Sequence, residues 1–379
     1  MRILHVNERA SDLGGVERIL HDTAKTLAEE GWSQALLHEE DESNARFAEP
    51  FEHAGSDASI VERFDPDLVL VHKTRNALRA EQLARRYPTA RLVHDHDLFC
   101  LRRHKYLPMN GRLCERAAGM ACYTNLCFVQ RSGEGSTFPI TFRGIRAQQR
   151  ETATNVRMRR YIVGSRWMRD QLVKNGLPEA SIDIVHPVPR SLGRAACLPP
   201  SLTDEILYVG QIVRGKGVDL LLRALAELRR PWRATLVGDG NHLEACRELA
   251  GELGISDRVR FTGWVDHDRL ASFYAGARFA VVPSRWPEPF GMVGPEAMAR
   301  GRPVIGFAAG GIPDWLDDGV TGLLVPPGDI GGLTRAMDRL LGDPALTAAM
   351  GRAAAARVDR ELTHRSYIDA LKRSLEATT

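Results

Sequence analysis

Two glutamates eight residues apart, Glu288 and Glu296, have the type and spacing to hold a ligand rich in hydroxyl groups. Glu288 lies in a Pro-Glu-Pro-Phe-Gly loop whose prolines restrict the backbone. Glu296 follows Pro295, which suits the first turn of a helix because its missing N–H would be unsatisfied there anyway. A carboxylate at a helix start is favoured by the backbone dipole, and it can accept two hydrogen bonds from a vicinal diol. Taken singly, each glutamate is more typical of a surface helix start or a plain turn than of a ligand site.

Lys216 is the cation best placed to bind a diphosphate. It lies between two glycines in the segment 210–217, after a predicted strand at 206–209 and before a predicted helix that runs through Leu228. A mobile cation and the positive end of a helix dipole act together at such a place. Arg214 of the same loop adds a second positive charge.

Two further glycine motifs are compatible with an anion or substrate site. Gly14 and Gly15 separate a predicted strand at 2–7 from a predicted helix that runs to about Glu30, so backbone can approach a ligand there. Gly238 follows a predicted strand in the sequence Thr-Leu-Val-Gly-Asp-Gly. Each motif is a weak signal by itself.

His94 ends a predicted strand at 91–94. In a parallel sheet ligands bind beyond the carboxyl ends of the strands, where an imidazole can donate a hydrogen bond to a hydroxyl or stabilise developing charge. A lone histidine at a strand end is otherwise a structural residue.

Four cysteines, Cys100, Cys114, Cys122 and Cys127, fall within one loop-like stretch. Structural zinc sites usually show paired cysteines two to four residues apart, whereas the gaps here are 13, 7 and 4 residues. The pattern favours reduced, packed thiols, with a structural metal cluster as the alternative.

The elements that must position these residues alternate between apolar runs and amphipathic helices, which predicts parallel sheets covered on both faces. Pro187, Pro189, Gly193, Pro199 and Pro200 mark a linker. We therefore predict two α/β domains, residues 1–190 and 203–359, and a last helix at about 360–379, which the resemblance described below implies packs back on the first domain.

Composition narrows the class of protein. Hydrophobic residues make up 44% and charged residues 26% of the chain, as in globular proteins. The net charge of +3 does not favour nucleic-acid binding, and no apolar run approaches the ~20 residues of a membrane span. Met1 leads straight into a strand rather than a signal peptide, so we expect a cytoplasmic protein. The segment 143–174 holds nine basic and two acidic residues, which is typical of a solvated helix face and is also compatible with peripheral contact with an anionic membrane.

The string Glu-Pro-Phe-Gly-x4-Glu-Ala-Met-Ala-x-Gly-x-Pro-Val that starts at Glu288 is followed by Gly310-Gly-Ile-Pro-Asp314 and by residues 319–329. Together these motifs closely resemble the nucleotide-sugar-binding half of the family-4 retaining glycosyltransferases (glycosyltransferase group 1). The resemblance is strong over residues 203–355 and looser over residues 1–190. It implies the GT-B fold, two Rossmann-like doubly wound domains that face each other across a cleft.

The resemblance also assigns roles. It implies a metal-independent hexosyltransferase that needs no cofactor and takes a nucleoside diphosphate sugar (UDP or GDP) as donor. The sugar is transferred with retention to a hydroxyl of a glycan or lipid-linked acceptor. Cell-surface polysaccharide or glycolipid synthesis is the implied setting. The implied catalytic residues are His94, Glu288 and Lys216; the donor-binding residues are Arg214, Lys216, Gly238, Glu288, Phe290, Gly291 and Glu296; the loop facing the diphosphate and the acceptor contains Gly14 and Gly15.

One departure bears on donor binding. The family's customary arginine after the first glycine of the 210–217 loop is Gln211 here, so Arg214 would have to supply the missing charge. Two alternatives therefore stay open: a GT-B-like epimerase or hydrolase that acts on a nucleotide sugar without an acceptor, and a non-catalytic nucleotide-sugar-binding protein.

Overall fold

The computed structural model describes residues 1–11, 14–40, 45–131, 140–146, 148 and 158–379, and it divides the chain into two compact units. Unit 1 contains Met1–Met109, Glu115–Arg190 and His364–Thr379, and unit 2 contains Asn110–Cys114 and Ser191–Thr363. The short segment Asn110–Cys114 is thus part of unit 2, although the sequence analysis placed all of residues 1–190 in the first domain. In the part of the chain that the structure describes, no helix is both long and apolar enough to cross a membrane.

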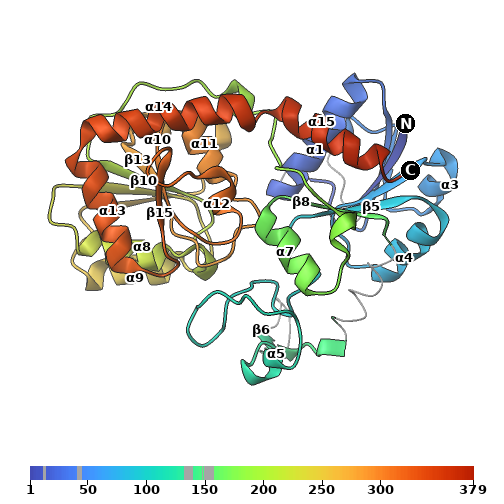
Figure 1. Ribbon diagram of the computed structural model, residues 1–379, viewed down its shortest axis with the longest axis horizontal. Helices are drawn as coiled ribbons and strands as arrows, with labels where there is room; N and C mark the ends of the chain where they lie inside the picture. The colour runs from blue at the N-terminus through green and yellow to red at the C-terminus, as the bar shows by residue number, and fades with distance from the viewer. Residues whose placement is uncertain (12–13, 41–44, 132–139, 147, 149–157) are drawn as a thin grey trace. The chain divides into compact units, whose positions relative to one another are not determined.

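A seven-stranded parallel sheet forms the centre of unit 1, with the strand order β3-β2-β1-β4-β5-β8-β9. Its strands β5 and β8 are labelled in Figure 1. The order reverses between β1 and β4, and the crevice at such a reversal is the usual ligand site of open α/β sheets. The strands are β1 (Arg2–Asn7), β2 (Ser33–His38), β3 (His53–Gly55), β4 (Leu68–Val71), β5 (Thr89–Val93), β8 (Arg160–Val163) and β9 (Ile182–Ile184).

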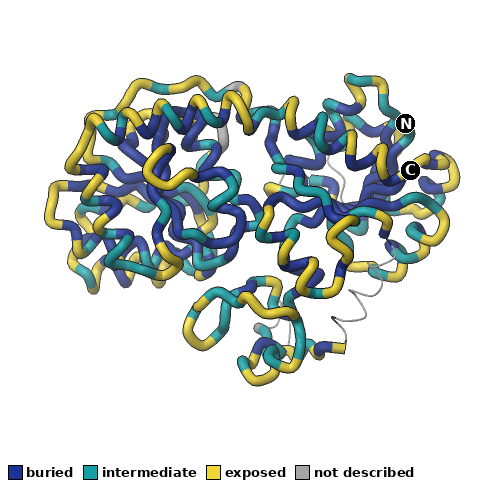
Figure 2. The backbone as a smooth tube through the Cα atoms, viewed as in Figure 1, coloured by how far each residue is buried: buried dark blue, intermediate teal, exposed yellow. Residues whose placement is uncertain are grey.

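Alternate residues of the strands pack into different apolar clusters on the two faces of this sheet. Leu36 of β2 joins Leu20 and Ala24 of helix α1, whereas its neighbours Ala35 and Leu37 join the opposite cluster. The dark core of Figure 2 follows these strands. The helices of unit 1 are α1 (Gly15–Glu29), α2 (Ala45–Ala48), α3 (Ser59–Phe64), α4 (Ala77–Arg86), α5 (Ala121–Thr124), α7 (Arg166–Lys174) and α15 (His364–Glu376), with a 3-10 turn η1 (Glu179–Ser181).

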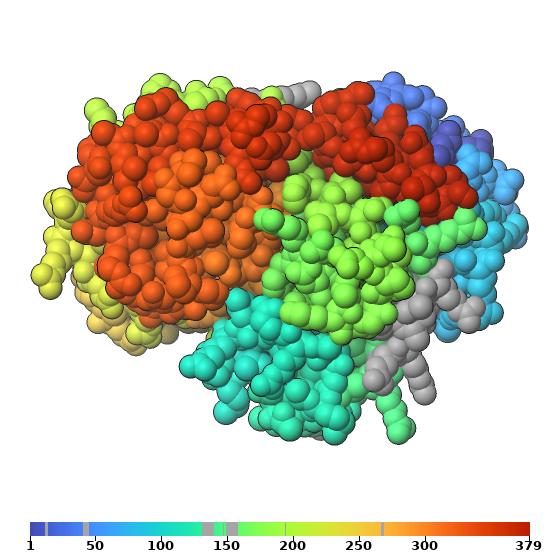
Figure 3. All heavy atoms as spheres, in the orientation of Figure 1, coloured from blue at the N-terminus to red at the C-terminus, as the bar shows by residue number. Residues whose placement is uncertain are grey.

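The C-terminal region contains two helices where one stretch from about Arg360 was expected. Helix α14 (Pro344–Glu361) ends before Leu362, and α15 begins at His364. Helix α15 packs on unit 1, where the hydroxyl groups of Tyr367 and Thr23 are 2.8 Å apart. In Figure 3 this helix, in dark red, lies over the surface of unit 1 next to α1, in blue.

An antiparallel pair of short strands, β6 (Val129–Arg131) and β7 (Ile140–Phe142), lies outside the main sheet of unit 1. All three residues of β7 are exposed, including Phe142. The sequence analysis predicted neither strand, because three-residue strands carry too little periodicity to be recognised.

Unit 2 has a six-stranded parallel sheet with the order β12-β11-β10-β13-β14-β15, which reverses between β10 and β13. Its strands are β10 (Glu205–Val209), β11 (Arg233–Val237), β12 (Val259–Gly263), β13 (Phe279–Val282), β14 (Val304–Phe307) and β15 (Gly322–Val325). Its helices, besides α14, are α8 (Val218–Ala226), α9 (Leu243–Glu252), α10 (His267–Gly276), α11 (Val293–Ala299), α12 (Ile312–Trp315) and α13 (Ile330–Gly342), with 3-10 turns η2 (Leu192–Arg194) and η3 (Arg214–Lys216). Each unit therefore has the parallel sheet that the alternating pattern predicted and the doubly wound topology that the resemblance implied.

Candidate functional site

Lys216 and Glu288 form an ion pair in unit 2. The Lys216 Nζ donates to Oε1 of Glu288 at 2.8 Å and to Oε2 at 3.0 Å, and the hydroxyl of Ser284 donates to Oε1 at 2.5 Å. The Glu288 side chain is 6% exposed and that of Lys216 is 29% exposed. An ionised carboxylate has about four acceptor positions, so these three bonds leave Glu288 able to accept a further hydroxyl.

The strand order explains why these two side chains meet. Lys216 lies in the turn η3 after β10, and Glu288 lies in the loop after β13, the strand hydrogen-bonded to β10. Because both loops leave the carboxyl ends of strands on either side of the reversal, the pair lies at the position where open α/β sheets bind ligands.

Three interactions hold the two loops together. The backbone N–H of Trp286 donates to the carbonyl of Gly215 at 2.8 Å. The Arg285 guanidinium donates to the carbonyl of Arg214 at 2.8 Å and forms a two-pronged ion pair with Asp219, with both N–O distances at 2.9 Å. Such a planar pair fixes orientation as well as distance. The Glu288 loop is therefore anchored to the Lys216 loop independently of the Lys216–Glu288 bond.

A third loop supports Glu288 from its backbone side. The N–H of Gly311 donates to the Glu288 carbonyl at 2.6 Å, and the indole N–H of Trp315 donates to the Phe290 carbonyl at 2.6 Å. Gly310 has a φ of +65°, and a Cβ on it would stand 2.5 Å from the backbone nitrogen of Glu288 and closer still to its carbonyl oxygen. Only glycine fits this close approach without a shift of the loop.

The other predicted donor-site residues of unit 2 lie around these loops. The Phe290 side chain is 2% exposed and belongs to the core, so only its backbone is left for ligand contact. Gly291 has a φ of +91°, next to the Glu288 side chain. Gly238 follows β11 with a φ of +140°, against the carbonyl of Gly210.

Glu296 is half-buried in the first turn of α11, and its N–H donates to the Met292 carbonyl at 3.0 Å. Pro295 is the third residue of this helix, still within the turn where its missing N–H costs no hydrogen bond. Burial first, and then the negative charge of Glu296, raise the pKa of Tyr274.

Arg214 and Gln211 are both exposed. The Gln211 carbonyl accepts a hydrogen bond from the Tyr208 hydroxyl at 2.7 Å, which holds the backbone of the loop while its amide side chain stays at the surface. Because the Arg214 side chain is exposed, it can turn towards an anion, as its predicted role requires.

Two predicted glycines and one histidine lie in unit 1. Gly14 precedes α1 with a φ of +124°, and Gly15 is the first residue of that helix. His94 comes directly after β5 and is half-buried. Its Nε2 lies 3.2 Å from Nδ1 of His72, a residue that directly follows β4. Burial lowers the pKa of His94 to about 3, and the positive charge of Lys73 acts in the same direction.

Sequence reasoning missed the partners of the predicted residues. His72 is hydrogen-bonded to His5 of β1, and His5 is hydrogen-bonded to Gln34 of β2. A signal for them existed, because histidine and glutamine are unusual inside otherwise apolar strands. Ser284, a partner of Glu288, gave no signal, because its hydroxyl is meaningful only once the loop has folded.

The possible metal cluster of Cys100, Cys114, Cys122 and Cys127 finds no support among the described residues. Within the described residues, no group of three or more histidine, cysteine or acidic side chains could hold a metal ion. Cys114 belongs to unit 2, whereas Cys100, Cys122 and Cys127 belong to unit 1. Cys100 instead accepts a hydrogen bond from the backbone of Lys105.

Much of the basic segment 143–174 is engaged inside unit 1. Arg159 donates to the carbonyls of Thr378 and Thr379, while other basic side chains of the segment pair with carboxylates. These pairs are Arg160–Asp183, Arg169–Asp170, Arg169–Glu179 and Lys174–Glu115. Arg150 and Arg157 lie outside the described residues. The charge available for a membrane is thus smaller than the sequence count indicates.

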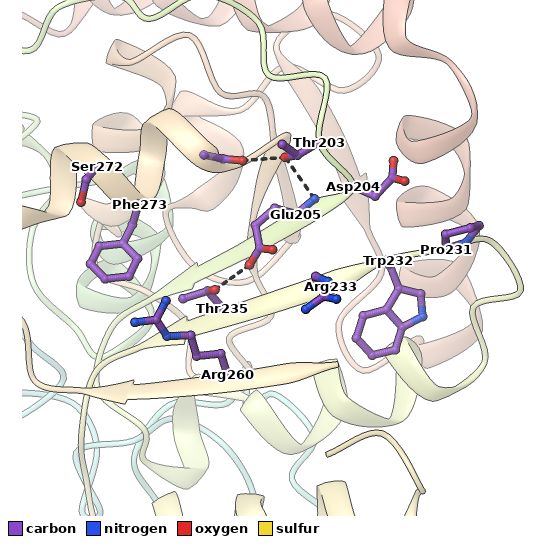
Figure 4. A pocket seen from close by; sticks show the side chains of 11 residues that line it. Thr203, Asp204, Glu205, Pro231, Trp232, Arg233, Thr235, Arg260, Ser272 and Phe273 are labelled. Carbon is purple, nitrogen blue, oxygen red and sulfur yellow. Dashed lines mark hydrogen bonds between the residues drawn. The ribbon is translucent and has the colours of Figure 1, made fainter. Parts of the chain in front are cut away.

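A hollow of about 600 Å³ lies elsewhere in unit 2 (Figure 4). Its lining includes the first residues of β10 and β11, Glu205 and Arg233, and the Glu205 carboxylate accepts a hydrogen bond from Thr235 at 2.5 Å. The hollow is therefore at the amino ends of the strands. Because ligands of open α/β sheets bind at the carboxyl ends, we place the site at Lys216 and Glu288 rather than here.

Comparison with known proteins bears on the same region. Residues 198–357 match the family described as "Glycosyl transferases group 1". Alpha-D-kanosaminyltransferase of Streptomyces kanamyceticus is 37% identical over 153 residues, which cover 40% of this chain and 39% of that protein. D-inositol 3-phosphate glycosyltransferase of Mycolicibacterium paratuberculosis is 40% identical over 185 residues, which cover 47% of this chain and 42% of that protein. The matched stretches span less than half the length of either relative.

Both units together resemble solved structures. The structure of Anabaena HepE in complex with UDP-glucose superposes with a TM-score of 0.76 and 18% identity, and the alignment covers 100% of both chains. At this identity the likeness shows a shared fold.

Proposed function

Residues 198–357 belong to the group 1 glycosyl transferases and the chain has the GT-B fold; from this premise we propose that the protein transfers a sugar from a nucleoside diphosphate sugar to an acceptor hydroxyl. The observation that carries the proposal is the Lys216–Glu288 pair at the strand reversal of unit 2. A lysine and a carboxylate side by side suit a ligand with an anionic diphosphate next to a ring of hydroxyl groups.

The donor roles follow from this arrangement. Lys216 stabilises the departing diphosphate, with Arg214 as the second cation in place of the customary arginine at Gln211. Glu288 accepts hydrogen bonds from hydroxyls of the donor sugar. Glu296 accepts hydrogen bonds from the ribose diol at the start of α11. Gly238, Gly291 and the backbone of Phe290 line the same site.

The acceptor binds on unit 1, past Gly14, Gly15 and His94. Transfer proceeds with retention, by attack on the face from which the diphosphate leaves, with a leaving phosphate oxygen as the base. Positive charge on Lys216 and Arg214 supplies the stabilisation of the diphosphate, so the proposal requires neither a divalent metal nor a cofactor. Expected support for this assignment is full transfer activity in the presence of EDTA.

The donor carries UDP or GDP. The acceptor is a glycan or a lipid-linked glycan in cell-surface polysaccharide or glycolipid synthesis, with the chain in the cytoplasm and in peripheral contact with the anionic inner face of the membrane.

Binding of nucleoside diphosphates tests the proposal. Thermal unfolding is followed with UDP, GDP, ADP, dTDP and CMP, for the natural chain and for Glu296→Ala. A ligand at a hundred times its dissociation constant adds about 2.7 kcal/mol to the free energy of unfolding. One diphosphate should stabilise the natural chain and lose most of its effect in the variant. No response to any of the five would contradict the proposed donor site.

Product analysis separates the enzymatic alternatives. Incubation with the donor sugar alone should leave it intact over the time in which transfer to an added acceptor is complete. Free sugar or an epimer formed without acceptor would support the hydrolase or epimerase instead.

A further inference from the structure

Four polar side chains form a continuous line of hydrogen bonds across neighbouring strands of unit 1. Gln34 of β2, His5 of β1, His72 after β4 and His94 after β5 follow one another in the order in which these strands lie in the sheet. The imidazole rings of His5 and His72 have centroids 5.3 Å apart and planes 22° apart, and those of His72 and His94 have centroids 5.4 Å apart and planes 14° apart, as expected for rings joined edge to edge. The line crosses the reversal between β1 and β4, where unit 1 is expected to bind its ligand.

The direction of every hydrogen bond in this line is fixed from one end. The Gln34 Nε2 lies 2.5 Å from the carbonyl oxygen of Ala24, which can only accept, so the amide nitrogen must point there. The Gln34 oxygen therefore faces His5, 2.9 Å from its Nε2, and accepts a hydrogen bond from it. The opposite amide orientation would place two acceptor oxygens against each other.

The direction of this first hydrogen bond also determines the tautomer of each following ring, because a neutral imidazole has one donor and one acceptor nitrogen. His5 donates through Nε2, so its Nδ1 is an acceptor and the His72 Nε2, 3.0 Å away, must donate to it. His72 Nδ1 is then an acceptor, and the His94 Nε2, 3.2 Å away, must donate in turn. This leaves Nδ1 of His94 as an acceptor with no partner among the described residues.

The groups around the line keep the three rings neutral. His5 and His72 are fully buried, and burial lowers the pKa of His5 to about 4 and that of His72 well below its ordinary value. Around His94, the positive charges of Lys73 and Arg91 oppose protonation and the negative charge of Asp97 favours it.

Each of the two cations near His94 is paired with a carboxylate. Arg91 and Asp97 form an ion pair at 2.9 Å, and Lys73 lies 3.5 Å from Asp95. Burial therefore dominates at His94, and a neutral ring is the form present near pH 7.

We propose that Gln34, His5 and His72 are positioning residues that hold His94 as a neutral imidazole with its proton on Nε2, so that Nδ1 accepts a hydrogen bond from a substrate hydroxyl. This inference rests on the proposed sugar transfer for the identity of that hydroxyl. It differs from the expectation of a histidine that donates to a sugar. A ring of such low basicity orients the hydroxyl but does not keep its proton, which agrees with a leaving phosphate oxygen as the base.

Ring nitrogen NMR on the natural full-length chain tests the inference without any enzyme assay. Imidazole ¹⁵N chemical shifts distinguish a protonated from a bare nitrogen, and His94→Asn identifies the His94 signals by their loss. We expect protonated Nε2 and bare Nδ1 in His5, His72 and His94, unchanged from pH 5.5 to 8.5. A proton on Nδ1 of His94, or titration of His94 in this range, would overturn the inference.

Two variants of His72 separate positioning from simple packing. His72→Gln keeps a donor and an acceptor in the line, because a carboxamide presents both. His72→Phe keeps a ring but breaks the line. We expect His72→Phe to allow both tautomers of His94 and to lower kcat/KM for transfer about tenfold, the worth of one hydrogen bond, while His72→Gln stays close to the natural chain. Equal losses in the two variants would contradict the inference.

Failure of the proposed function is recognisable separately. If no sugar is transferred but the ring nitrogens show the expected protonation, the line of hydrogen bonds stands and the enzymatic proposal is wrong. If sugar is transferred and His94 carries its proton on Nδ1, the proposed function stands and the positioning role is wrong.

Discussion

Replacement of Gly310 by alanine tests whether a close backbone approach holds the Glu288 loop in place. A Cβ on Gly310 would stand 2.5 Å from the Glu288 nitrogen, a separation that real Cβ atoms essentially never show. The obstacle is backbone rather than a flexible side chain, so the loop has to move. Gly319 is a matched control, because it lies in the same unit with a φ of +76° and a Cβ added there would meet nothing within 4 Å.

The expected magnitudes follow from these two geometries. Alanine in the left-handed region costs roughly 1–2 kcal/mol, which is the whole effect expected for Gly319→Ala. Gly310→Ala carries the same cost, and crowding adds about 1–3 kcal/mol more. For a unit of this size 1 kcal/mol lowers Tm by about 2–4 °C, so we expect a fall of roughly 5 °C for the control and roughly 10 °C for Gly310→Ala.

Donor binding supplies the second readout. The displaced loop carries both the carboxylate of Glu288 and the carbonyl that accepts from Gly311, so Gly310→Ala should weaken binding of the nucleoside diphosphate sugar about tenfold in calorimetry. Gly319→Ala should bind as the natural chain does. Equal stability and equal affinity in the two variants would refute the reasoning, since the loop would then have room to yield.

Three further perturbations have defined expected outcomes. Lys216→Met leaves the buried Glu288 carboxylate with the Ser284 hydroxyl as its described side-chain partner. We expect the free energy of unfolding, measured with denaturant, to fall by about 1–3 kcal/mol, and diphosphate binding to be lost. Unchanged binding would show that Lys216 does not belong to the site. Gln211→Arg restores a cation to the exposed loop, and the diphosphate affinity measured by calorimetry should rise about tenfold. An unchanged affinity would show that the diphosphate does not lie at this loop. The pKa of His5 falls on folding to about 4 and that of His94 to about 3, so the unfolded state binds more protons below pH 6.5. The free energy of unfolding should therefore fall from pH 6.5 towards pH 4, by up to about 1.4 kcal/mol per pH unit for each ring. A flat profile would show that the rings are not buried in the neutral form.

The sequence predicted the architecture of each unit because the fold follows from local patterns. Short apolar runs and amphipathic helices alternate, and a parallel sheet is the arrangement that buries both. Element ends were less certain. The break between α14 and α15 at Leu362 and Thr363 carries neither proline nor glycine, so no local signal marks it.

The candidate site could be predicted residue by residue but not as an arrangement. Lys216 and Glu288 were assigned to different parts of a ligand, and their mutual bond depends on β10 and β13 being neighbours in the sheet. Arg285 offered no motif, although its pair with Asp219 anchors the loop. Contacts between loops far apart in the sequence follow from strand order, which a single sequence does not state.

Each unit has its proposed site beside the strand reversal of its own sheet, but the two units hold their polar groups by different means. In unit 2 the cation Lys216 is 29% exposed on a loop, so it can leave Glu288 and follow a ligand. In unit 1 the groups belong to the strands or directly follow them, and five of the six ring nitrogens of His5, His72 and His94 have hydrogen-bond partners within the line. A buried polar group without a partner costs about 1–3 kcal/mol, so each ring is tolerated only because its neighbours satisfy it. The sixth nitrogen, Nδ1 of half-buried His94, has no hydrogen-bond partner among the described residues, and a hydroxyl from outside the chain would supply one.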